Sequence, residues 1–485
     1  MIKVENFIGG KFTPCSKHID SFNPSNGQVH ACIPDSSSDD VEQAVEAAQK
    51  ALPGWSGLST RERSKVMMKI ADLVEQRLDE FAVAESTDQG KPVWLAKAVD
   101  IPRTILNFRF FATAILHQMN ESTEQSEFGA VNYTVRCAAG IAGLITPWNL
   151  PLYLLSFKVA PAIGAGCCVV VKPSEMTSVT AWMLCQVFQE AGLPEGVVNM
   201  VFGTGKNAGA AIVQHPKINL LSFTGSTAVG KYIQEKSAQH MKKLSLELGG
   251  KNAGVIFADA NLDKCIPTSV RSAFANQGEI CLCTSRLFVH QDIFDEFCKR
   301  YVETVRSTLK VGPPKDNSSK IGALVSKEHM EKVKSYIKLA VKEGGTILCG
   351  ETVDPPLQLP EENSQGYYCQ PTVIVGLKDD ARCMQEEIFG PVVCIAPFTG
   401  EDDVIKRAND VPYGLSATLW TQDVSRLHRL ARQFEAGTIW CNCWLVRDLR
   451  MPFGGMKMSG VGRECQKESI EFYSEVKTIC VQYAS

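Results

Sequence analysis

The residues best suited to chemistry lie in the stretch 274–286, which carries the cysteine Cys281. Asn276, Gln277 and Gly278 interrupt regular structure, so we expect Cys281 on a turn between a helix and the apolar strand that follows. A thiolate is a strong nucleophile, and a polar turn is where a reactive cysteine would be placed. The chain has 18 cysteines, however, and most are expected to be small buried side chains, so the assignment of Cys281 depends on other residues.

Two further groups would support such a nucleophile. Glu247 ends an apolar alternation and is followed by two glycines, which would let its carboxylate reach into a cleft; a solvated carboxylate at a strand end is the alternative. The turn at residues 222–231 has glycines and hydroxyls at the start of a helix, where free backbone N–H groups suit a phosphate. The same residues also form ordinary helix caps.

Two glycine-rich segments resemble nucleotide-binding motifs but fail on spacing. Gly203, Gly205 and Gly209 approximate a dinucleotide fingerprint, with the third glycine one position late. Residues 225–231 approximate the phosphate loop of nucleotide hydrolases, but Tyr232 stands where a magnesium-binding Ser or Thr is required. We therefore do not expect a nucleoside triphosphatase.

Composition bounds the class of protein. A chain of 485 residues is expected to fold as two or three domains, and 45% hydrophobic with 21% charged residues is typical of globular proteins. The formal net charge of -3 gives no electrostatic argument for nucleic acid or an anionic membrane as a partner. Abundant cysteine without a signal-peptide pattern favours the reducing cytoplasm. The most apolar region, residues 141–171, is too interrupted by prolines and Lys158 to span a bilayer.

The elements that must position these groups alternate between helix and strand. Helices are predicted at the capping-box pattern Ser59–Glu62 and over residues 93–119. From residue 138 a strand–helix–strand pattern predicts a mostly parallel sheet with helices on both faces, and a second such series follows residue 250. The turn motifs fall after strands, at the carboxyl ends where such sheets bind ligands.

Seven motifs occur together in an order and spacing that resemble the aldehyde dehydrogenase superfamily. The likeness covers essentially the whole chain, and seven ordered motifs are far more specific than any one of them alone. The motifs are Thr146–Asn149, Lys172–Glu175, Phe223–Ser226, Glu247–Lys251, Asn276–Cys281, Glu387–Pro391 and Pro452–Gly455.

The resemblance implies an α/β fold with three parts. A Rossmann-type NAD-binding domain would comprise residues 1–119 and 139–249, and an α/β catalytic domain would comprise residues 250–450. A β-strand oligomerisation arm would comprise residues 120–138 and 467–485 and would join copies of the chain into a homodimer or homotetramer. Each half of the arm contains an alternating segment typical of an exposed strand, able to pair with the other half or with a partner chain.

The resemblance also implies roles in aldehyde oxidation. Cys281 would attack the carbonyl carbon as a thiolate, and because a free cysteine has a pKa of about 8.5, its pocket would have to favour the anion. The side-chain amide of Asn149 and the backbone N–H of Cys281 would stabilise the oxyanion, and hydride would pass to NAD. Glu247 would activate water to hydrolyse the thioester. Cys283 matches no catalytic position, and no metal site is expected, because the two cysteines lack partner ligands at zinc spacing.

For the cofactor, the resemblance implies NAD rather than NADP. Lys172 and Glu175 would contact the adenosine ribose, where a carboxylate accepts hydrogen bonds from the hydroxyls and repels a 2′-phosphate. The Gly225–Ser226 turn would hold the pyrophosphate, and Glu387 with Phe389 would hold the nicotinamide ribose. The implied cofactor residues are Ile145, Trp148, Lys172, Glu175, Gly225, Ser226, Leu248, Glu387 and Phe389.

Substrate identity depends on two arginines. Arg103 lies on a helix that in this family lines the substrate tunnel. Arg447 lies in the loop before Phe453, where members that oxidise neutral aldehydes usually carry apolar residues. If both face the tunnel, they would clamp the carboxylates of a dicarboxylic semialdehyde; two surface arginines are the alternative. Phe453, like Trp148, would form a pocket wall or belong to the core.

Residues 279–283 and 444–450 are similar to the branch of the family that oxidises 2-aminomuconic 6-semialdehyde to 2-aminomuconate, in tryptophan breakdown by the kynurenine route. The alternatives are 2-hydroxymuconic semialdehyde, which has nearly the same shape and charge, and retinal, which an apolar tunnel would tolerate. Outside this class, Cys281, Glu247 and Asn149 together disfavour a catalytically silent structural relative. A cofactor-free cysteine hydrolase is the last alternative, because this sequence has no obvious Cys–His–Asn order.

Overall fold

An eight-stranded sheet dominates the first half of the chain in the computed structural model, which describes residues 1–483. Its strand order is β22-β12-β11-β8-β9-β10-β2-β3, and the five from β12 to β10 run parallel. β22 and β2 are antiparallel to their neighbours. The strands are β2 (Asn6–Ile8), β3 (Lys11–Thr13), β8 (Ile141–Ile145), β9 (Cys168–Lys172), β10 (Val198–Met200), β11 (Leu220–Thr224), β12 (Lys243–Glu247) and β22 (Gly460–Val461).

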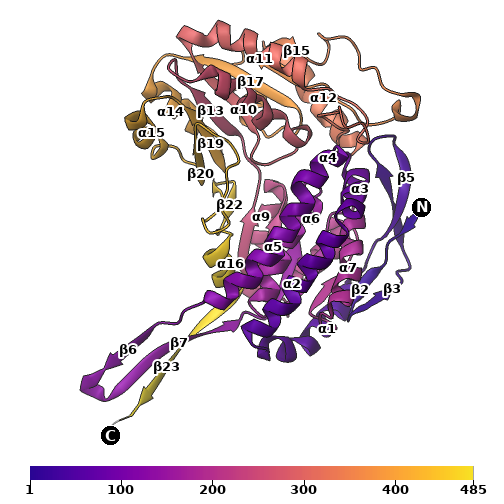
Figure 1. Ribbon diagram of the computed structural model, residues 1–485, viewed down its shortest axis with the longest axis vertical. Helices are drawn as coiled ribbons and strands as arrows, with labels where there is room; N and C mark the ends of the chain where they lie inside the picture. The colour runs from indigo at the N-terminus through magenta and orange to yellow at the C-terminus, as the bar shows by residue number, and fades with distance from the viewer. Residues whose placement is uncertain (484–485) are drawn as a thin grey trace.

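Helices pack on this sheet and on one another because its central strands are apolar on both sides. Every residue of β8 and β9 is buried, so both faces need a covering layer. The capping box predicted at Ser59 starts α2, with the Ser59 hydroxyl accepting from the N–H of Glu62. The helices are α1 (Ser38–Gly57), α2 (Thr60–Gln76), α5 (Ile101–Ala114), α6 (Pro151–Gly164), α7 (Val179–Ala191), α8 (Ala210–Gln214) and α9 (Thr227–Ser237) (Figure 1).

Two helical segments differ from the sequence analysis. α3 (Leu78–Gln89) was not predicted, because it buries the polar residues Glu85, Asp88 and Gln89 and so shows no apolar stripe. The helix predicted over 93–119 is divided into α4 (Val93–Leu95), a π-helical turn at Ala96–Asp100, and α5. Pro102 lies in the first turn of α5, and a proline cannot continue the hydrogen bonding of the preceding turn, which fits the break there.

The second sheet has seven strands in the order β15-β16-β17-β14-β13-β19-β20, all parallel except β15 at one edge. Its first strand in sequence, β13, follows β12 of the first sheet after only four residues, so one short turn joins the two sheets. Its strands are β13 (Asn252–Ile256), β14 (Thr284–His290), β15 (Thr346–Cys349), β16 (Thr372–Val375), β17 (Val392–Phe398), β19 (Ser416–Trp420) and β20 (Thr438–Cys441).

The helices of this second unit follow the predicted strand–helix alternation. They are α10 (Leu262–Phe274), α11 (Phe294–Thr308), α12 (Lys327–Lys342), α13 (Arg382–Gln385), α14 (Glu401–Asn409) and α15 (Val424–Ala431). The strand–helix series predicted after residue 250 is therefore confirmed. The two wound sheets confirm the predicted α/β fold class.

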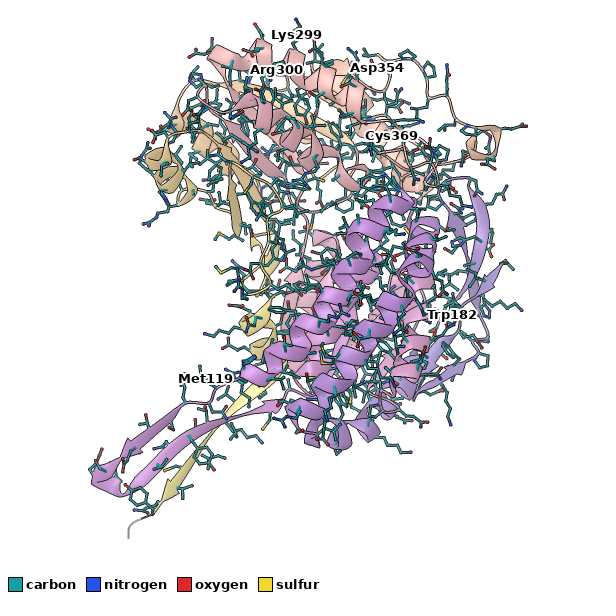
Figure 2. The ribbon with its side chains drawn as sticks, in the orientation of Figure 1. Met119, Trp182, Lys299, Arg300, Asp354 and Cys369 are labelled. Atoms are coloured by element: carbon teal, nitrogen blue, oxygen red, sulfur yellow. The ribbon has the colours of Figure 1, made fainter. Side chains whose placement is uncertain are left out.

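Three antiparallel strands protrude from the body of the molecule (Figure 1). β23 (Ser474–Gln482) pairs along its whole length with β7 (Ala130–Ala138), and β6 (Ser122–Gln125) pairs with the other side of β7. Met119, which is 89% exposed, lies where the chain leaves the helices for these strands (Figure 2). The two strands predicted in the arm therefore pair with each other. Ala484 and Ser485, the end of the predicted arm, lie outside the described residues.

The remaining elements are small. β1 (Ile2–Lys3), β4 (His18–Asn23) and β5 (Gln28–Pro34) form a three-stranded sheet, and β18 (Tyr413–Gly414) pairs with β21 (Met456–Lys457). α16 (Gln466–Phe472) precedes β23. In the described part of the chain, no helix combines the length and the apolar character needed to cross a bilayer.

Candidate active site

The carboxyl ends of four neighbouring strands meet at one edge of the first sheet. Ile145 at the end of β8 is in register with Lys172 of β9 and with Phe223 of β11. Thr224 at the end of β11 is in register with Glu247 of β12. Because ligands of wound sheets bind outside the carboxyl ends of the strands, this edge is where a site is expected.

A cavity of about 270 Å³ lies at this edge and contains most of the predicted residues. It is lined by Trp148, Asn149, Gly225, Ser226, Leu248, Cys281, Glu387 and Phe389, together with Pro147, Thr224, Gly249, His329 and Lys332. The predicted residues Ile145, Lys172, Glu175, Glu247, Arg103, Arg447 and Phe453 do not line it. The first group therefore forms one chamber, and the second group surrounds it or lies beyond it.

Cys281 lies on the predicted turn between α10 and β14, and the chain before it has an unusual backbone. Asn276 and Gln277 have φ of 51° and 58°, and Gly278 has φ of 73°, so three consecutive residues lie in the left-handed region. A side chain at Gly278 would overlap the carbonyl of Gly390, so only glycine fits there. This turn delivers the half-exposed Cys281 side chain to the cavity.

The charges that face Cys281 are mostly negative. Burial raises the pKa of the Cys281 thiol, and the carboxylates of Glu387 and Glu247 raise it further, while Arg447 acts in the opposite direction. The expectation that this pocket favours the thiolate is therefore wrong. Attack by Cys281 consequently requires an acceptor for its proton close by.

Asn149 is fixed at both its main chain and its side chain. Its carbonyl accepts hydrogen bonds from Lys91 Nζ at 3.1 Å and from Asn276 Nδ2 at 3.0 Å. Its own Nδ2 donates to the carbonyl of Glu279 at 2.8 Å. An amide nitrogen has two hydrogens, so the second hydrogen of Asn149 Nδ2 remains for a ligand in the cavity. Lys91 is itself held by a fully buried ion pair with Asp100 at 2.7 Å.

Glu247 has a buried carboxyl group whose protonation depends on its neighbours. Burial raises its pKa well above the ordinary value, the adjacent Glu464 raises it further, and Lys158 and Arg447 oppose the rise. In the described structure its Oε1 has no hydrogen-bond partner, and it faces Gly454. Glu247 therefore loses its proton at a higher pH than a free carboxyl does, and the deprotonated form is the one that can act as a general base.

A buried ion pair next to Glu247 was missed by the sequence analysis. Lys158 Nζ lies 2.7 Å from Glu464 Oε1 and donates to Ser222 Oγ at 2.8 Å. Lys158 is the one lysine of the otherwise apolar helix α6, and such a lysine was the available signal. Its partner, 306 residues further along the chain, could not be identified from sequence.

The opposite wall of the cavity is aromatic and acidic. Trp148, His329 and Phe389 contact one another edge-on, with ring centroids 5.0 to 6.2 Å apart. Phe389 has φ of 61°, a strained conformation for a large residue, and its carbonyl lies 2.6 Å from His329 Nε2. Burial lowers the pKa of His329 to about 4, so the ring is neutral. Glu387 Oε1 accepts from the N–H of Gly250 at 2.9 Å.

Lys172 and Glu175 lie at the far end of the same edge, away from Cys281. Lys172 Nζ donates to Glu175 Oε2 at 3.0 Å and to the carbonyl of Gly203 at 2.9 Å. Gly203 opens the segment that fails as a dinucleotide fingerprint, so this segment nonetheless borders the predicted ribose site. The Thr204 side chain caps the helical turn Gly205–Gly209. The N–H and the hydroxyl of Thr204 both donate to Asp35, so they do not offer hydrogen bonds to a phosphate.

The structure brings Arg103 and Arg447 together. Arg103 lies over the Tyr153 ring, 5.1 Å from its centroid, and Arg447 Nη1 is 3.4 Å from the Tyr153 hydroxyl. Arg447 also stacks on Phe453, with 3.8 Å between the guanidinium carbon and the ring centroid. Both side chains are half-buried rather than at the surface. Tyr153 was missed by the sequence analysis, because an aromatic residue in an apolar helix is indistinguishable from core.

A second, larger cavity of about 470 Å³ opens on the side of Leu150 and Ile280, the neighbours of Asn149 and Cys281. Its walls are mainly apolar, and Arg271 and Lys320 contribute exposed cations. The turn that carries Cys281 therefore lies between two chambers, one polar and one apolar. Among residues 1–483 no cluster of three metal-ligating side chains is present.

The structure thus combines two wound sheets with a cysteine turn at the carboxyl edge of the first sheet. The sequence profile described as "Aldehyde dehydrogenase family" matches residues 12–479. The chain therefore belongs to the aldehyde dehydrogenase family, as the seven motifs predicted.

Individual relatives agree along the whole chain. A protein of Danio rerio named "2-aminomuconic semialdehyde dehydrogenase" is 59% identical, with 99% of this chain and 98% of the relative covered. A protein of Pseudomonas sp. (strain CF600) named "2-hydroxymuconic semialdehyde dehydrogenase" is 45% identical, with 99% and 100% covered. A Bacillus cereus aldehyde dehydrogenase, solved as an NAD+ complex, is 37% identical with a TM-score of 0.95, and 99% of this chain and 97% of that chain are covered.

Proposed function

We propose that this chain oxidises 2-aminomuconic 6-semialdehyde to 2-aminomuconate, with NAD as the hydride acceptor. The observation that carries this proposal is the pair Arg103 and Arg447. In the described residues their contacts are aromatic rings, an amide, a phenol and a thiol rather than carboxylates. Arg103 Nη2 is buried and has no hydrogen-bond partner there. A buried cation without a counter-charge is costly, so a carboxylate of the substrate would relieve it.

The chemistry would begin at Cys281. The Cys281 thiol would give its proton to water as its sulfur bonds to the aldehyde carbon. The resulting thiohemiacetal oxyanion would accept a hydrogen bond from the free N–H of Asn149 Nδ2. When NAD is bound, it accepts the hydride, and a thioester remains on Cys281. Glu247 would then take a proton from water as the water attacks the thioester carbon, which releases the carboxylic acid and restores the thiol.

The residues around the 270 Å³ cavity fit a nicotinamide dinucleotide. Ser226 caps α9, so the free N–H groups of that helix face the cavity, where a pyrophosphate would lie. Glu387 is oriented by the N–H of Gly250 and would bind the hydroxyls of the nicotinamide ribose. The absence of a side chain at Gly249 makes room for that carboxylate. Lys172 and Glu175 would hold the adenosine ribose, and Ile145 and Leu248 would pack beside it.

Two alternative substrates are considered, because one observation favours each. 2-Hydroxymuconic semialdehyde offers the same single carboxylate to the two arginines, and a relative with that name is 45% identical, against 59% for the one named for the amino compound. Retinal would find an apolar chamber in the 470 Å³ cavity. The buried arginine pair would gain nothing from retinal, which carries no charge.

The remaining assignments concern organisation. We propose residues 1–119 and 139–249 as the NAD-binding domain, residues 250–450 as the catalytic domain, and residues 120–138 and 467–485 as the arm that joins a homodimer or homotetramer. Exposed Tyr133, Val476 and Val481 on the protruding strands support the last of these. Unpaired cysteines throughout the described chain support a reducing, cytoplasmic setting.

The test is a steady-state comparison on the purified chain with NAD. NADH formation would be followed with 2-aminomuconic semialdehyde, 2-hydroxymuconic semialdehyde, retinal and benzaldehyde. We expect the two muconic semialdehydes to have kcat/KM values at least about 100-fold above benzaldehyde, with the amino compound higher. Similar values for all four would refute the assigned substrate, and no NADH with any aldehyde would refute the oxidation itself. The Cys281→Ser variant is the control for turnover that depends on the thiol.

A further inference from the structure

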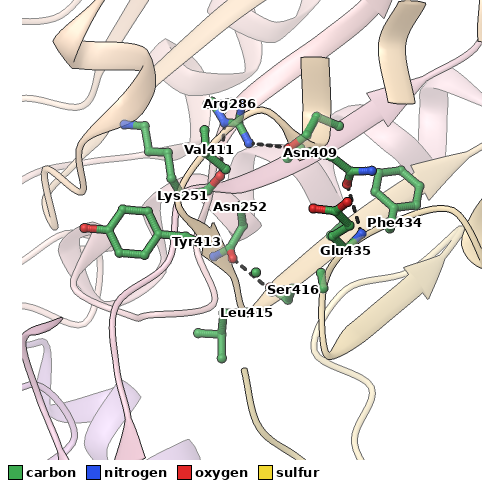
Figure 3. Close-up of a pocket in the computed structure, with 15 residues that line it drawn as sticks. Lys251, Asn252, Arg286, Asn409, Val411, Tyr413, Leu415, Ser416, Phe434 and Glu435 are labelled. Atoms are coloured by element: carbon green, nitrogen blue, oxygen red, sulfur yellow. Dashed lines mark hydrogen bonds between the residues drawn. The ribbon is translucent and has the colours of Figure 1, made fainter. Parts of the chain in front are cut away.

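Asn252 connects the second sheet to the turn that carries Cys281. It is the first residue of β13 and is 3% exposed. Its Nδ2 donates to the carbonyl of Cys281 at 2.7 Å and to the carbonyl of Cys283 at 2.8 Å. Its Oδ1 accepts from the N–H of Ser416 on β19 at 3.0 Å (Figure 3). Both amide hydrogens and the amide oxygen are therefore used, and this pattern also fixes which side-chain atom is nitrogen.

The local backbone is arranged to make this contact possible. The pairing of β13 with β14 shifts register between Asn252 and Ala253, and such an irregularity re-aims a side chain. Gly250 passes so close that a side chain there would lie 2.8 Å from Asn252 Oδ1 and 3.0 Å from the Cys281 carbonyl. Two backbone bonds close the turn itself, from the N–H of Glu279 to the carbonyl of Asn276 and from the N–H of Cys283 to the carbonyl of Ile280.

Asn252 acts on the nucleophile without touching the chamber in which the reaction would occur. It does not line the 270 Å³ cavity, and it faces instead a water-sized space bounded by Lys251, Arg286 and Asn409 (Figure 3). Holding the carbonyls of Cys281 and Cys283 fixes two peptide planes of the turn. The first of these planes is attached to the Cys281 α-carbon, so it restricts the direction of the Cys281 side chain. The peptide plane that contains the Cys281 N–H belongs to the Ile280 carbonyl, which the N–H of Cys283 holds in the same turn.

We infer that Asn252 is a positioning residue, which holds the Cys281 turn so that the sulfur and the backbone N–H face the aldehyde together. The inference rests on the proposed role of Cys281 as nucleophile, but not on the identity of the substrate. A misplacement of about 1 Å in a reacting group costs on the order of 100-fold in rate. Loss of Asn252 should therefore lower kcat and leave the binding of NAD and aldehyde nearly unchanged.

Two variants test the inference. Asn252→Leu removes all three hydrogen bonds at nearly constant volume. Asn252→Asp keeps the acceptor for Ser416 but directs a carboxylate oxygen at two carbonyl oxygens. Asn409→Leu is the matched control, because Asn409 bonds the carbonyl of Gln433 and the N–H of Glu435 on the far wall of the same space. Circular dichroism and thermal unfolding would establish that each variant is folded.

The readouts are pre-steady-state NADH formation with benzaldehyde, KM for aldehyde and NAD, and the rate at which iodoacetamide alkylates Cys281, measured by mass spectrometry. For both Asn252 variants we expect kcat and the burst rate to fall about 10- to 100-fold, with each KM changed less than about 3-fold. The Asn409→Leu variant should retain the activity of the unmodified protein. For Asn252→Asp the activity relative to the unmodified protein should rise as pH falls, because a protonated carboxyl can donate one of the lost bonds.

The inference is overturned if folded Asn252 variants keep kcat within about 2-fold of the unmodified protein, or if their KM rises by as much as their kcat falls. It is also overturned if Asn409→Leu lowers kcat by the same factor. Should Asn252→Leu fail to fold, Asn252→Asp carries the test by itself, since its shape is unchanged and its pH profile is diagnostic. If the unmodified protein shows no NADH burst but Cys281 is alkylated at a normal rate, the proposed oxidation is refuted. The role of Asn252 would still be decided by comparing the Cys281 alkylation rate of the Asn252 variants with that of the unmodified protein.

Discussion

Replacing Arg447 by methionine tests whether the arginine pair recognises carboxylates. The guanidinium stacks on Phe453 at 3.8 Å and is held at its edge by the Tyr153 hydroxyl at 3.4 Å. It is therefore already oriented to form a planar, charge-assisted contact with a carboxylate. Truncating one partner of such a partly buried contact costs about 2 to 3 kcal/mol. Because about 1.4 kcal/mol corresponds to a tenfold change, we expect kcat/KM for a muconic semialdehyde to fall about 30- to 100-fold.

The assay compares this substrate with benzaldehyde, which has no carboxylate and should lose at most about 3-fold in kcat/KM. Arg450→Met is the matched control, because Arg450 lies in the same loop, is exposed and already bonds Asp448 at 2.9 Å. Arg103→Met should lower kcat/KM for the muconic semialdehyde by a similar factor. Equal losses on the charged and the neutral aldehyde, or an equal loss in the Arg450 variant, would refute recognition by the pair.

Three further outcomes follow from the site and the core. Glu247→Gln should retain a burst of NADH but slow the steady state about 100-fold or more, because the thioester would form and persist. Thioester hydrolysis should accelerate with rising pH as Glu247 ionises. Glu464→Gln, which removes a charge that raises the Glu247 pKa, should move that profile to lower pH, and Lys158→Met should move it to higher pH; opposite or absent shifts in single-turnover pH profiles would contradict this coupling. Phe108→Ala, at a fully buried position of α5, should cost about 3 to 5 kcal/mol of stability in urea unfolding.

The elements and the residues near Cys281 were predictable because local patterns specify them. Alternating strands and helices predicted the two sheets, and the hydroxyl–carboxylate pair at Ser59 and Glu62 predicted the start of α2. Five of the seven motifs contribute residues to one cavity. α3 was not predictable in the same way. It packs Glu85 against the N–H of Leu152 and the hydroxyl of Thr180, so its inward face is polar and has no apolar period.

Contacts between distant segments account for what the sequence did not predict. His329 enters the cavity from the start of α12 and is held by the carbonyl of Phe389, a bond that no spacing rule anticipates. The rise in the pKa of Cys281 comes first from burial and then from the carboxylates of Glu387 and Glu247, which lie 140 residues apart in the chain and meet only in the fold. Asn252 follows a recognised motif by one position, but its function depends on a register shift that only the folded strand shows.

The path of the last residues of the chain has a consequence for biosynthesis. The segment before α16 returns from the second sheet to the first, where Gly460 of β22 pairs with Glu247 and Glu464 reaches Lys158. A nascent chain that has already formed both sheets on the ribosome therefore still lacks the strand that borders its candidate base. The ion pair beside that base also forms only after Glu464 has been synthesised, so the candidate site is completed later than the central strands of both sheets. A protein shortened before β22 would lack this strand, Glu464 and the core residues Cys465, Ile470 and Tyr473, so both the candidate base and the first core would lose packing partners.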